Sequence, residues 1–500
     1  MEALRPVSVS APAFKGLNKQ SSSVDLDAGW ALEADNCVID SQGRLSSRKG
    51  FSAVTGSSIG SYSIEAIGEY LKIDGSSVIM SAANNNIYQG TSTLTSKYST
   101  SITKNRWQMI NFNNLFYFFQ IDHNPLIYDG TTLQLLSAYT GYAGSAPAAD
   151  CAIGAYGRIW AANTATNKTV VSYSDTLQGH VWTGGASGSL DLKSVWTTGM
   201  DEIVALSAFN GFLVIFGKKS ILVYSNPTTP SSMVLIEHIK GIGCIARDSI
   251  QDLGTDILFL SDTGVRSFQR TIQEKSMPMR DVSKNVRDDL VAHITSQTDK
   301  TKITSVYNEK ERFYLLNFPQ DEITYCFDVS RILPDGTNPV TTWTSINPRS
   351  MLTTRSGDLL FGQTGILGKY DTYQDNTSSY DMSYLTAWIS FAEPFLQKIL
   401  KKINFTMVGS NSSVFTVKFA YDYSSEYFSE QKAVTGGVVS EYNVGEYNIA
   451  EYSSGVVIDE VTAIGKSAGK MVQVGVFSVV NGAKLAIQKF DIYAKKGRMV

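Results

Sequence analysis

The feature that most constrains this chain is a short unit of strands and turns that recurs along its middle. The copy between Arg247 and Gln269 contains the apolar run Ile257 to Leu260, bounded by Gly254 on one side and by Asp262-Thr-Gly264 on the other. Glycine and Asp-Thr-Gly sequences favour turns, whereas short runs of apolar residues favour strands. The unit therefore predicts strand, turn, strand, turn, strand.

Copies of this unit follow one another at a nearly constant spacing of roughly 47 residues, which is the length of one four-stranded propeller blade. The middle strands begin near Val78, Phe116, Ile159, Leu213, Leu258, Phe313 and Leu359. Recurrence at one period indicates a repeated architecture more strongly than any single copy does. We expect a six- or seven-bladed β-propeller, with one unit split between the two ends of the ring.

Composition supports an all-β fold and excludes some functions. The chain has 25 Tyr and 23 Phe, and Ser, Thr, Asn and Gly fill the intervals between apolar runs, as many short strands joined by tight turns require. Charged residues make up only 18% of the chain and the net charge is −3, so electrostatics give no reason to expect a protein that grips nucleic acid.

Residues 1–60 do not follow the repeat. Within them, residues 34–50 predict a hairpin, because Asp40-Ser-Gln-Gly43 provides a turn and Cys37, Ile39 and Leu45 can face one side. Beyond Tyr384 the chain changes again to alternating strands that predict a β-sandwich. Those strands are expected at Trp388–Phe391, Phe405–Val408, Val414–Phe419, Met471–Val480 and Lys484–Ala494.

A lone hairpin is not stable in water, so we expect residues 1–60 to pair with the C-terminal sandwich. This gives an N-terminal part of a platform domain at 1–60, a β-propeller at 61–380 and a C-terminal β-sandwich part of the platform at 381–500. Inside the propeller, Val282, Val286, Leu290 and Ile294 recur at steps of four and predict one amphipathic helix near 281–295. It is expected to pack on the rim of the ring, with a partner-facing stripe as the alternative.

Residue types that carry chemistry are scattered. His123, His180, His238 and His293 form no metal-binding motif, and His123 beside Asn124-Pro125 is interpreted as a turn residue. The four cysteines, Cys37, Cys151, Cys244 and Cys326, lie far apart, and three of them, within or beside apolar strand runs, are interpreted as buried thiols. We therefore predict no catalytic, cofactor-binding or metal-binding residues.

Several motifs resemble functional ones but lack a necessary part. Gly465-Lys-Ser467 lacks the glycine of a phosphate-binding loop, since position 460 is Glu, and Gly241-Ile-Gly243 lacks the third glycine of a dinucleotide fingerprint. Both are interpreted as turns. The stretch Ser172 to Trp182 approximates the aspartate box of sialidase-type propellers, which is itself a structural turn.

Charged clusters have equally simple interpretations. Asp201-Glu202, Asp288-Asp289 and Asp321-Glu322 are adjacent acidic pairs, and side chains of neighbouring strand residues point apart, so we interpret them as solvated turns and not as a glycosidase pair. Lys398, Lys401 and Lys402 form the densest basic group. We interpret it as a solvated face, with phosphate contact as the alternative.

Neither a secretory signal nor a membrane span is expected. The first fourteen residues lack a charged region followed by an apolar one, and the longest apolar windows, Leu115–Ile121 and Phe212–Phe216, are too short for a bilayer. The protein is expected to stay in the cytosol or to enter a particle assembled there.

A set of short motifs resembles one known family. They are Gly16-Leu-Asn18, the ADNCVID segment from Ala34, Gly43-Arg-Leu45, Arg48-Lys-Gly50, Phe259-Leu-Ser-Asp-Thr-Gly-Val265 and Arg312-Phe-Tyr-Leu315. In order and spacing they are similar to the tail nozzle proteins of short-tailed bacteriophages, also called tail tubular or packaged-DNA stabilisation proteins. The resemblance implies a homo-hexamer beneath the tail adaptor ring, genomic DNA passing through its channel without sequence-specific binding, and attachment sites for a receptor-binding tail fibre or tailspike.

The hypothesis is thus a structural virion protein of the viral tail that retains packaged DNA and conducts it during ejection. The first alternative is a propeller-type glycosidase or glycan-binding protein acting on host-surface sugar, and no convincing pair of carboxylates supports the enzyme. The second alternative is a monomeric propeller used as a cellular adaptor.

Overall fold

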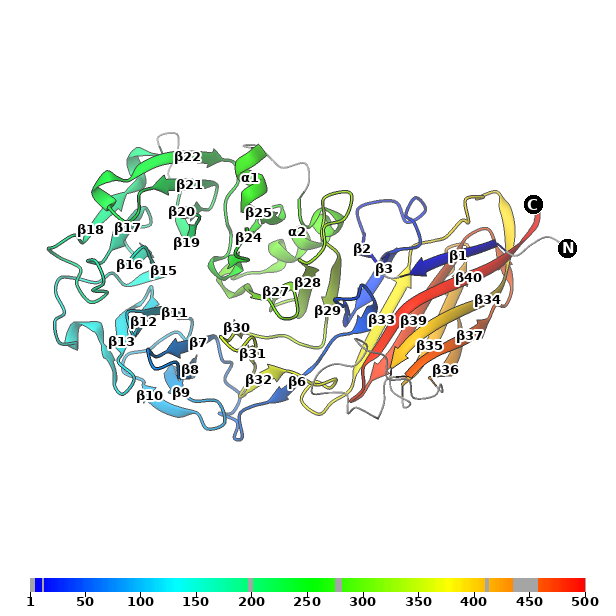
Figure 1. Ribbon diagram of the computed structural model, residues 1–500, viewed down its shortest axis with the longest axis horizontal. Helices are drawn as coiled ribbons and strands as arrows, with labels where there is room; N and C mark the ends of the chain where they lie inside the picture. Colours follow the sequence, from blue (N-terminus) through cyan, green and yellow to red (C-terminus); the bar gives the residue numbers. More distant parts are fainter. Residues whose placement is uncertain are drawn as a thin grey trace.

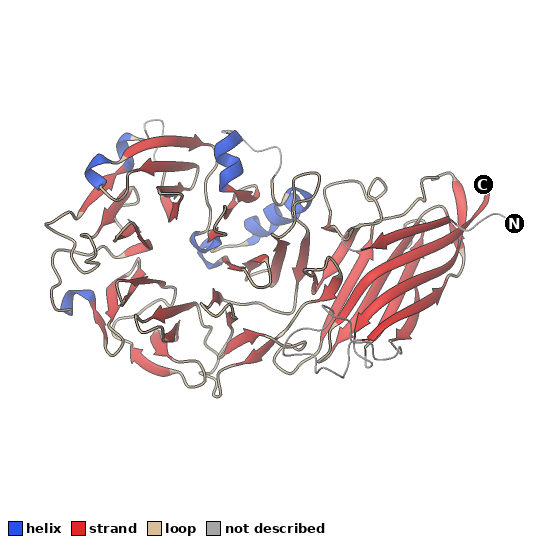
Figure 2. Ribbon diagram, viewed as in Figure 1, coloured by secondary structure: helices blue, strands red, loops and turns tan. Residues whose placement is uncertain are grey.

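The computed structural model describes residues 5–10, 13–196, 201–274, 281–409, 413–434 and 457–499. Figure 1 shows a ring of small sheets beside an elongated β-sheet platform, with both chain ends at the far end of the platform. Figure 2 shows that strands dominate both parts and that the helices belong to the ring. The expected all-β fold, a propeller inserted in a platform built from both chain ends, is confirmed.

Six four-stranded arrays and one three-stranded sheet follow one another around the ring in the described part of the chain. The first four arrays follow one another directly along the chain. They are β7 (Ala66–Leu71), β8 (Ser77–Ala83), β9 (Asn86–Gln89) and β10 (Thr95–Tyr98); β11 (Gln108–Phe112), β12 (Leu115–Gln120), β13 (His123–Tyr128) and β14 (Leu133–Leu135); β15 (Ala149–Ala155), β16 (Arg158–Thr164), β17 (Val170–Tyr173) and β18 (Gly188–Asp191); β19 (Ile203–Phe209), β20 (Phe212–Gly217), β21 (Ser220–Ser225) and β22 (Val234–Lys240).

The remaining three units close the ring. The three-stranded sheet contains β23 (Gln251–Asp252), β24 (Ile257–Ser261) and β25 (Gly264–Ser267). The next array, here called the junction blade, contains β26 (Thr304–Asn308), β27 (Phe313–Phe318), β28 (Ile323–Asp328) and β29 (Val340–Trp343). The last contains β30 (Ser350–Thr353), β31 (Leu359–Gly362), β32 (Leu367–Tyr370) and β6 (Phe51–Ala53).

The last blade is split between distant parts of the chain. Its outermost strand is β6, whose Phe51 pairs with Tyr370 of β32. Residues 51–53 lie within the stretch that the sequence analysis assigned to the platform, yet here they complete the propeller. A split blade of this kind closes the ring with ordinary antiparallel pairing, so that neither end of the ring is left as an open sheet edge.

Apolar middle strands hold the blades against one another. In β12 every residue from Phe116 to Gln120 is buried, and Phe116 and Phe118 share a cluster with Tyr70 of the preceding blade. Trp160 of β16 and Ile215 of β20 pack together in the same way between the next two blades. Because both faces of a middle strand are covered, its sequence is a nearly continuous apolar run.

The platform consists of two packed sheets. The first has the order β37-β34-β40-β5-β4, with β1 on β40 and β38 on β34. Val7 of β1 lies opposite Ile492 of β40, so the two chain ends share this sheet. These strands are β1 (Arg5–Ser10), β4 (Cys37–Ile39), β5 (Leu45–Ser47), β34 (Leu396–Gly409), β37 (Val457–Ile464), β38 (Ala468–Gly469) and β40 (Leu485–Met499).

The second sheet runs without a break from the ring into the platform. It has ten strands in the order β26-β27-β28-β29-β2-β3-β33-β39-β35-β36. Phe405 and Phe490 from the first sheet meet Val417 and Val474 from the second in the buried core between them. The strands not yet placed are β2 (Gly16–Leu17), β3 (Trp30–Asp35), β33 (Tyr380–Thr386), β35 (Val414–Tyr421), β36 (Phe428–Ala433) and β39 (Val472–Val480).

Gly16 lies where the junction blade meets the platform strands. Gly16 pairs in parallel with both Val340 of β29 and Trp30 of β3. The backbone is left-handed, with φ +79°, and a Cβ at this position would lie 2.4 Å from the Val340 carbonyl oxygen. Only glycine allows so close an approach of two backbones.

Local predictions were confirmed at two places and incomplete at others. The hairpin β4–β5 forms with its turn at Asp40–Gly43. A helix, α2 (Arg287–Ser296), follows a short 3-10 turn at Lys284–Val286 and buries Leu290 and Ile294. The sequence analysis missed α1 (Phe268–Glu274). It also expected a strand at 388–391, where only Ile389 makes a bridge, to Val472.

Candidate functional site

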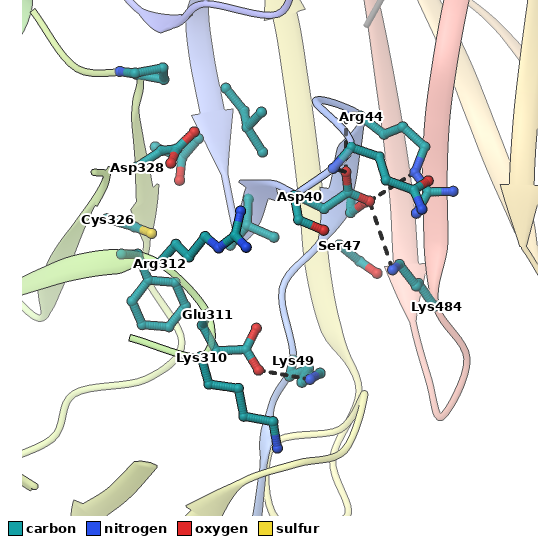
Figure 3. Close-up of a pocket in the computed structure, with 18 of the residues that line it drawn as sticks. Asp40, Arg44, Ser47, Lys49, Lys310, Glu311, Arg312, Cys326, Asp328 and Lys484 are labelled. Atoms are coloured by element: carbon teal, nitrogen blue, oxygen red, sulfur yellow. Dashed lines mark hydrogen bonds and ion pairs between the residues drawn. The ribbon is translucent and has the colours of Figure 1, made fainter. Parts of the chain in front are cut away.

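A cavity lies where the hairpin β4–β5 meets the junction blade (Figure 3). We call it the junction pocket; its volume is about 250 Å³. Its walls come from the hairpin, from the β26–β27 turn, from β28 and β29, from the end of β32 and from the turn before β40. The lining residues are Val38 to Gln42, Arg44, Ser46, Ser47, Lys49, Lys310 to Phe313, Cys326, Asp328, Pro339, Thr341, Tyr370, Tyr373 and Lys484.

Arg48, between two lining residues, fixes the hairpin in place. Its Nε donates to Asn36 Oδ1 at 3.0 Å, and Nη1 donates to the Lys49 carbonyl oxygen at 2.8 Å. Nη1 and Nη2 donate to the two carboxylate oxygens of Asp375 at 2.9 and 2.7 Å, and Nη2 also donates to Ser345 Oγ. All five N–H groups of this fully buried guanidinium therefore have acceptors, which is the condition under which a buried charge is tolerated.

Two ion-pair groups line the pocket. Asp40 Oδ2 accepts from Arg44 Nε at 2.8 Å, with Lys484 Nζ 3.8 Å away. Across the pocket, Lys49 Nζ lies 2.8 Å from Glu311 Oε1. Asp40 also accepts hydrogen bonds from backbone N–H groups of its own turn, so its charge is compensated within the hairpin.

The junction blade contributes the remaining charges. Asp328 Oδ1 accepts from Ser330 N at 2.9 Å and from Ser330 Oγ at 2.5 Å. Burial raises the pKa of Asp328, with the Ser330 hydrogen bonds opposing that effect. Lys310 and Arg312 come from the β26–β27 turn, and neither side chain has a hydrogen bond or ion pair with any described residue.

A second candidate region is the central channel of the propeller. Two cavities of about 210 and 300 Å³ lie along the innermost strands. Between them, Arg247 Nε donates to Asp248 Oδ1 at 2.7 Å and Arg247 Nη1 lies 3.2 Å from Asp150 Oδ1, while Arg106 donates to Asp248 Oδ2. This ion cluster ties three blades of the ring together.

Asp248 is the centre of that cluster. Burial acts to raise its pKa, but the guanidinium groups of Arg106 and Arg247 lower the pKa to about 2. Its own carbonyl oxygen accepts from Ser305 Oγ at 2.8 Å, which adds the junction blade to the connection. The cluster is internally satisfied, so its evident role is to hold the ring together.

One sequence interpretation was wrong. Lys398 does not belong to a solvated face; it is buried, and its Nζ donates to the carbonyl oxygens of Glu393 and, at 2.8 Å, Lys470. Burial lowers the pKa of Lys398. Of its two neighbours, Lys401 is exposed and Lys402 Nζ lies 4.7 Å from the centre of the Tyr493 ring. The three lysines therefore do not form one surface.

Of the three acidic pairs, Asp201-Glu202 lies in a loop and Asp321-Glu322 in a turn, whereas Asp288-Asp289 lies in the first turn of α2, so the turn interpretation was wrong for that pair. Asp201 accepts from the backbone N–H groups of Glu202, Lys218 and Lys219. Asp289 pairs with Lys19 at 2.6 Å. Asp321 accepts from His293 Nδ1.

The approximate aspartate box is also a turn. Asp175 Oδ1 accepts from Thr176 N at 2.7 Å and from Ala186 N at 3.0 Å, and Trp182 Nε1 donates to the Gly179 carbonyl oxygen. The hydrogen bond from the Ala186 N–H group, followed by that from Thr176, lowers the pKa of Asp175.

Other candidates also have structural surroundings. All four cysteines are free and buried, which agrees with the interpretation given to three of them. His123 is the first residue of β13, so its interpretation as a turn residue was wrong, and its ring nitrogens contact the carbonyl oxygens of Asn124 and Thr100. Gly241 and Gly465 both lie in loops outside the strands. No three potential metal ligands gather in the described ranges, and no described helix is long and apolar enough to cross a membrane.

Sequence reasoning did not find the junction pocket. Arg48 and Arg312 were noted only as parts of family motifs, and nothing in the local sequence indicates that they lie near Asp375 and the hairpin. The signal that could have pointed to Arg312 is its place in a blade turn, where glycine or asparagine is usual.

Fold and site together define a β-propeller protein with a composite β platform. No family model and no curated protein matches the chain. Solved structures with low identity resemble parts of it. They include the WD40 propeller domain of Doa1 (10% identity, 64% of this chain and 96% of that chain, TM-score 0.40), YCF48 bound to D1 peptide (9%, 68% and 96%, 0.33) and the extracellular domain of a putative hybrid two-component system from B. thetaiotaomicron (12%, 73% and 57%, 0.29).

Proposed function

We propose that this chain is a structural virion protein: the tail nozzle of a short-tailed bacteriophage. Six copies form a ring below the tail adaptor, retain the packaged DNA, conduct it during ejection and carry a receptor-binding fibre or spike. The proposal is supported by the family motifs, which extend from Gly16 to Leu315. It assigns no catalytic residue.

The observation that carries the proposal is the continuous β-sheet that connects propeller and platform. Domains of one chain move relative to each other by default unless the interface between them is extensive. Here a ten-stranded sheet crosses the boundary, and Arg48 joins the hairpin to Asp375. A ring subunit that contains DNA under pressure requires a fixed orientation of this kind.

The charge of the chain is compatible with a conduit. A strongly basic lining would bind phosphates through counterion release and hold the DNA, whereas a net charge of −3 lets a polyanion slide. The acidic pairs that a glycosidase would need are engaged in turns and ion pairs, which favours the structural role over the enzymatic one.

Location in the particle tests this function. Virions that carry a small electron-dense label at the C-terminus should show it on the tail, in a ring below the adaptor. Label on the capsid, or particles from which the protein is absent, would contradict the proposal. Because the C-terminal strand β40 is paired on both sides, the label should be attached through a flexible linker.

A glycan-binding propeller is the second candidate, favoured by the two cavities along the central channel. Gln108 and Ser207 line the larger one, and neutral amides and hydroxyls are groups that bind sugar hydroxyls. A glycan array with the purified protein tests it. Glycan binding that is lost in a folded Gln108→Ala variant would favour this candidate. Turnover of aryl glycosides by the protein would favour an enzyme.

A further inference from the structure

Arg312 has a left-handed backbone conformation, and the equivalent position in other blades is occupied by a smaller residue. In three other blades the residue immediately before the second strand is also left-handed, and it is Asn114, Gly157 or Gly211. Arg312 has φ +60° at the equivalent place before β27. An arginine is less stable than glycine or asparagine in the left-handed region of backbone conformation. We therefore expect the Arg312 side chain to have a role that compensates for this strain.

The turn around Arg312 is fixed on both sides. Arg312 N donates to the Asn308 carbonyl oxygen at 2.8 Å, and the Arg312 carbonyl oxygen accepts from Val329 N at 3.0 Å. Glu311 N donates to Asn308 Oδ1 at 2.9 Å. In Figure 3 the Arg312 side chain extends into the space between Asp328 and Asp40. A backbone held in this way presents the guanidinium to the junction pocket.

Positive charge exceeds negative charge in the junction pocket. Its cations are Arg44, Lys49, Lys310, Arg312 and Lys484, and its carboxylates are Asp40, Glu311 and Asp328. Asp40 and Glu311 are already paired with three of the cations, and Asp328 is hydrogen-bonded to Ser330. Lys310 and Arg312 make no hydrogen bond or ion pair with the described residues, although the positive charge of Arg312 acts to lower the pKa of Asp328.

We propose that the junction pocket binds a small oxyanion, a phosphate group being the best match, held by Arg312. A guanidinium offers two parallel N–H donors that fit two oxygens of a phosphate. The cavity of about 250 Å³ leaves room for an organic group beside Phe313, Cys326 and Val38. Because its walls come from both the platform and the junction blade, the bound anion connects the two.

Calorimetric titration of the full chain with inorganic phosphate, glycerol phosphate and succinate tests this site. Phosphate binding that is weakened at least about tenfold by Arg312→Asn supports it, since one charge-assisted hydrogen bond contributes that much. Tighter binding of glycerol phosphate supports an organic phosphate as the ligand, and equal binding of succinate supports a general oxyanion site. No binding of any of the three at millimolar concentration overturns the proposal.

Two controls separate binding from folding. Arg355→Asn changes an exposed arginine in the corresponding turn of the next blade, outside the pocket, and should leave the affinity unchanged. Arg312→Asn places a residue that favours left-handed backbone in the strained position, so the unfolding temperature without anion should stay equal or rise. Phosphate should then raise that temperature in the wild type and not in the variant. An equal rise in both proteins overturns the proposal.

Discussion

Arg48 and Asp375 lie 327 positions apart in sequence and form a bidentate pair, with N–O distances of 2.9 and 2.7 Å. The pair joins the N-terminal hairpin to the connection between the last blade and the platform. The Arg48 guanidinium also lies 4.0 Å from the centre of the Tyr380 ring. Propeller and platform are thus locked where the chain passes from one to the other.

Removal of one partner of this pair should be severely destabilising. Arg48→Gln leaves the Asp375 carboxylate, whose side chain is 10% exposed, without its cation, and loss of a partner from a buried pair costs about 3–5 kcal/mol. Urea unfolding of the variant and the wild type measures this. Lys104→Gln, which breaks a pair exposed by 60% and 39%, should cost less than about 1 kcal/mol. Equal losses in the two variants would contradict the locking role of Arg48.

Gly16 should tolerate no side chain. Gly16→Ala adds a Cβ 2.4 Å from the Val340 carbonyl oxygen as well as left-handed strain, so it should cost more than about 2 kcal/mol of unfolding free energy. Gly211→Ala is the matched control, because its φ is +83° but no atom lies within 4 Å of the added Cβ. That variant should lose only about 1 kcal/mol. A similar loss in both would mean that the contact with β29 does not matter.

Asp248 should make the ring sensitive to acid. Its pKa in the folded protein is about 2, below the ordinary value of 3.8, so its stabilising effect is complete above pH 4 and is lost as the pH falls towards 2. The effect is about 2 kcal/mol by linkage. Asp248→Asn should therefore be less stable at pH 7 and should show a shallower loss of stability between pH 4 and 2. Parallel curves for the two proteins, measured by urea unfolding at each pH, would exclude this role.

Substitution of Lys398 should lower the free energy of unfolding, whereas substitution of nearby Lys401 should not. Lys398→Met removes the donor to the carbonyl oxygens of Glu393 and Lys470, and leaving buried acceptors unpaired costs about 1–3 kcal/mol. Lys401→Met, on the exposed side, should change the unfolding free energy by less than about 0.5 kcal/mol. Thermal unfolding of both variants measures the contrast. An unchanged stability of Lys398→Met would instead support the interpretation of Lys398 as part of a solvated face.

The repeated blades were predictable because each one is encoded by a short continuous stretch of sequence, in which apolar runs are separated by turn residues. The composite platform was predictable by a physical argument, since the hairpin at 34–50 could not be stable alone. Lys398 could not be placed in this way, because its second acceptor, the Lys470 carbonyl oxygen, lies 72 residues away. Arg48 and Arg312 were missed for the same reason: a long side chain in a local sequence does not reveal which distant segment it meets.

The number of copies in the assembled protein tests the nozzle proposal most directly. Size-exclusion chromatography with light scattering, on the protein mixed with its tail adaptor, should give a complex that contains six copies of this 54.7 kDa chain. The protein alone can be single if assembly is sequential, so the adaptor must be present. A mass that corresponds to one copy, both alone and with the adaptor, would contradict the ring and with it the proposed function.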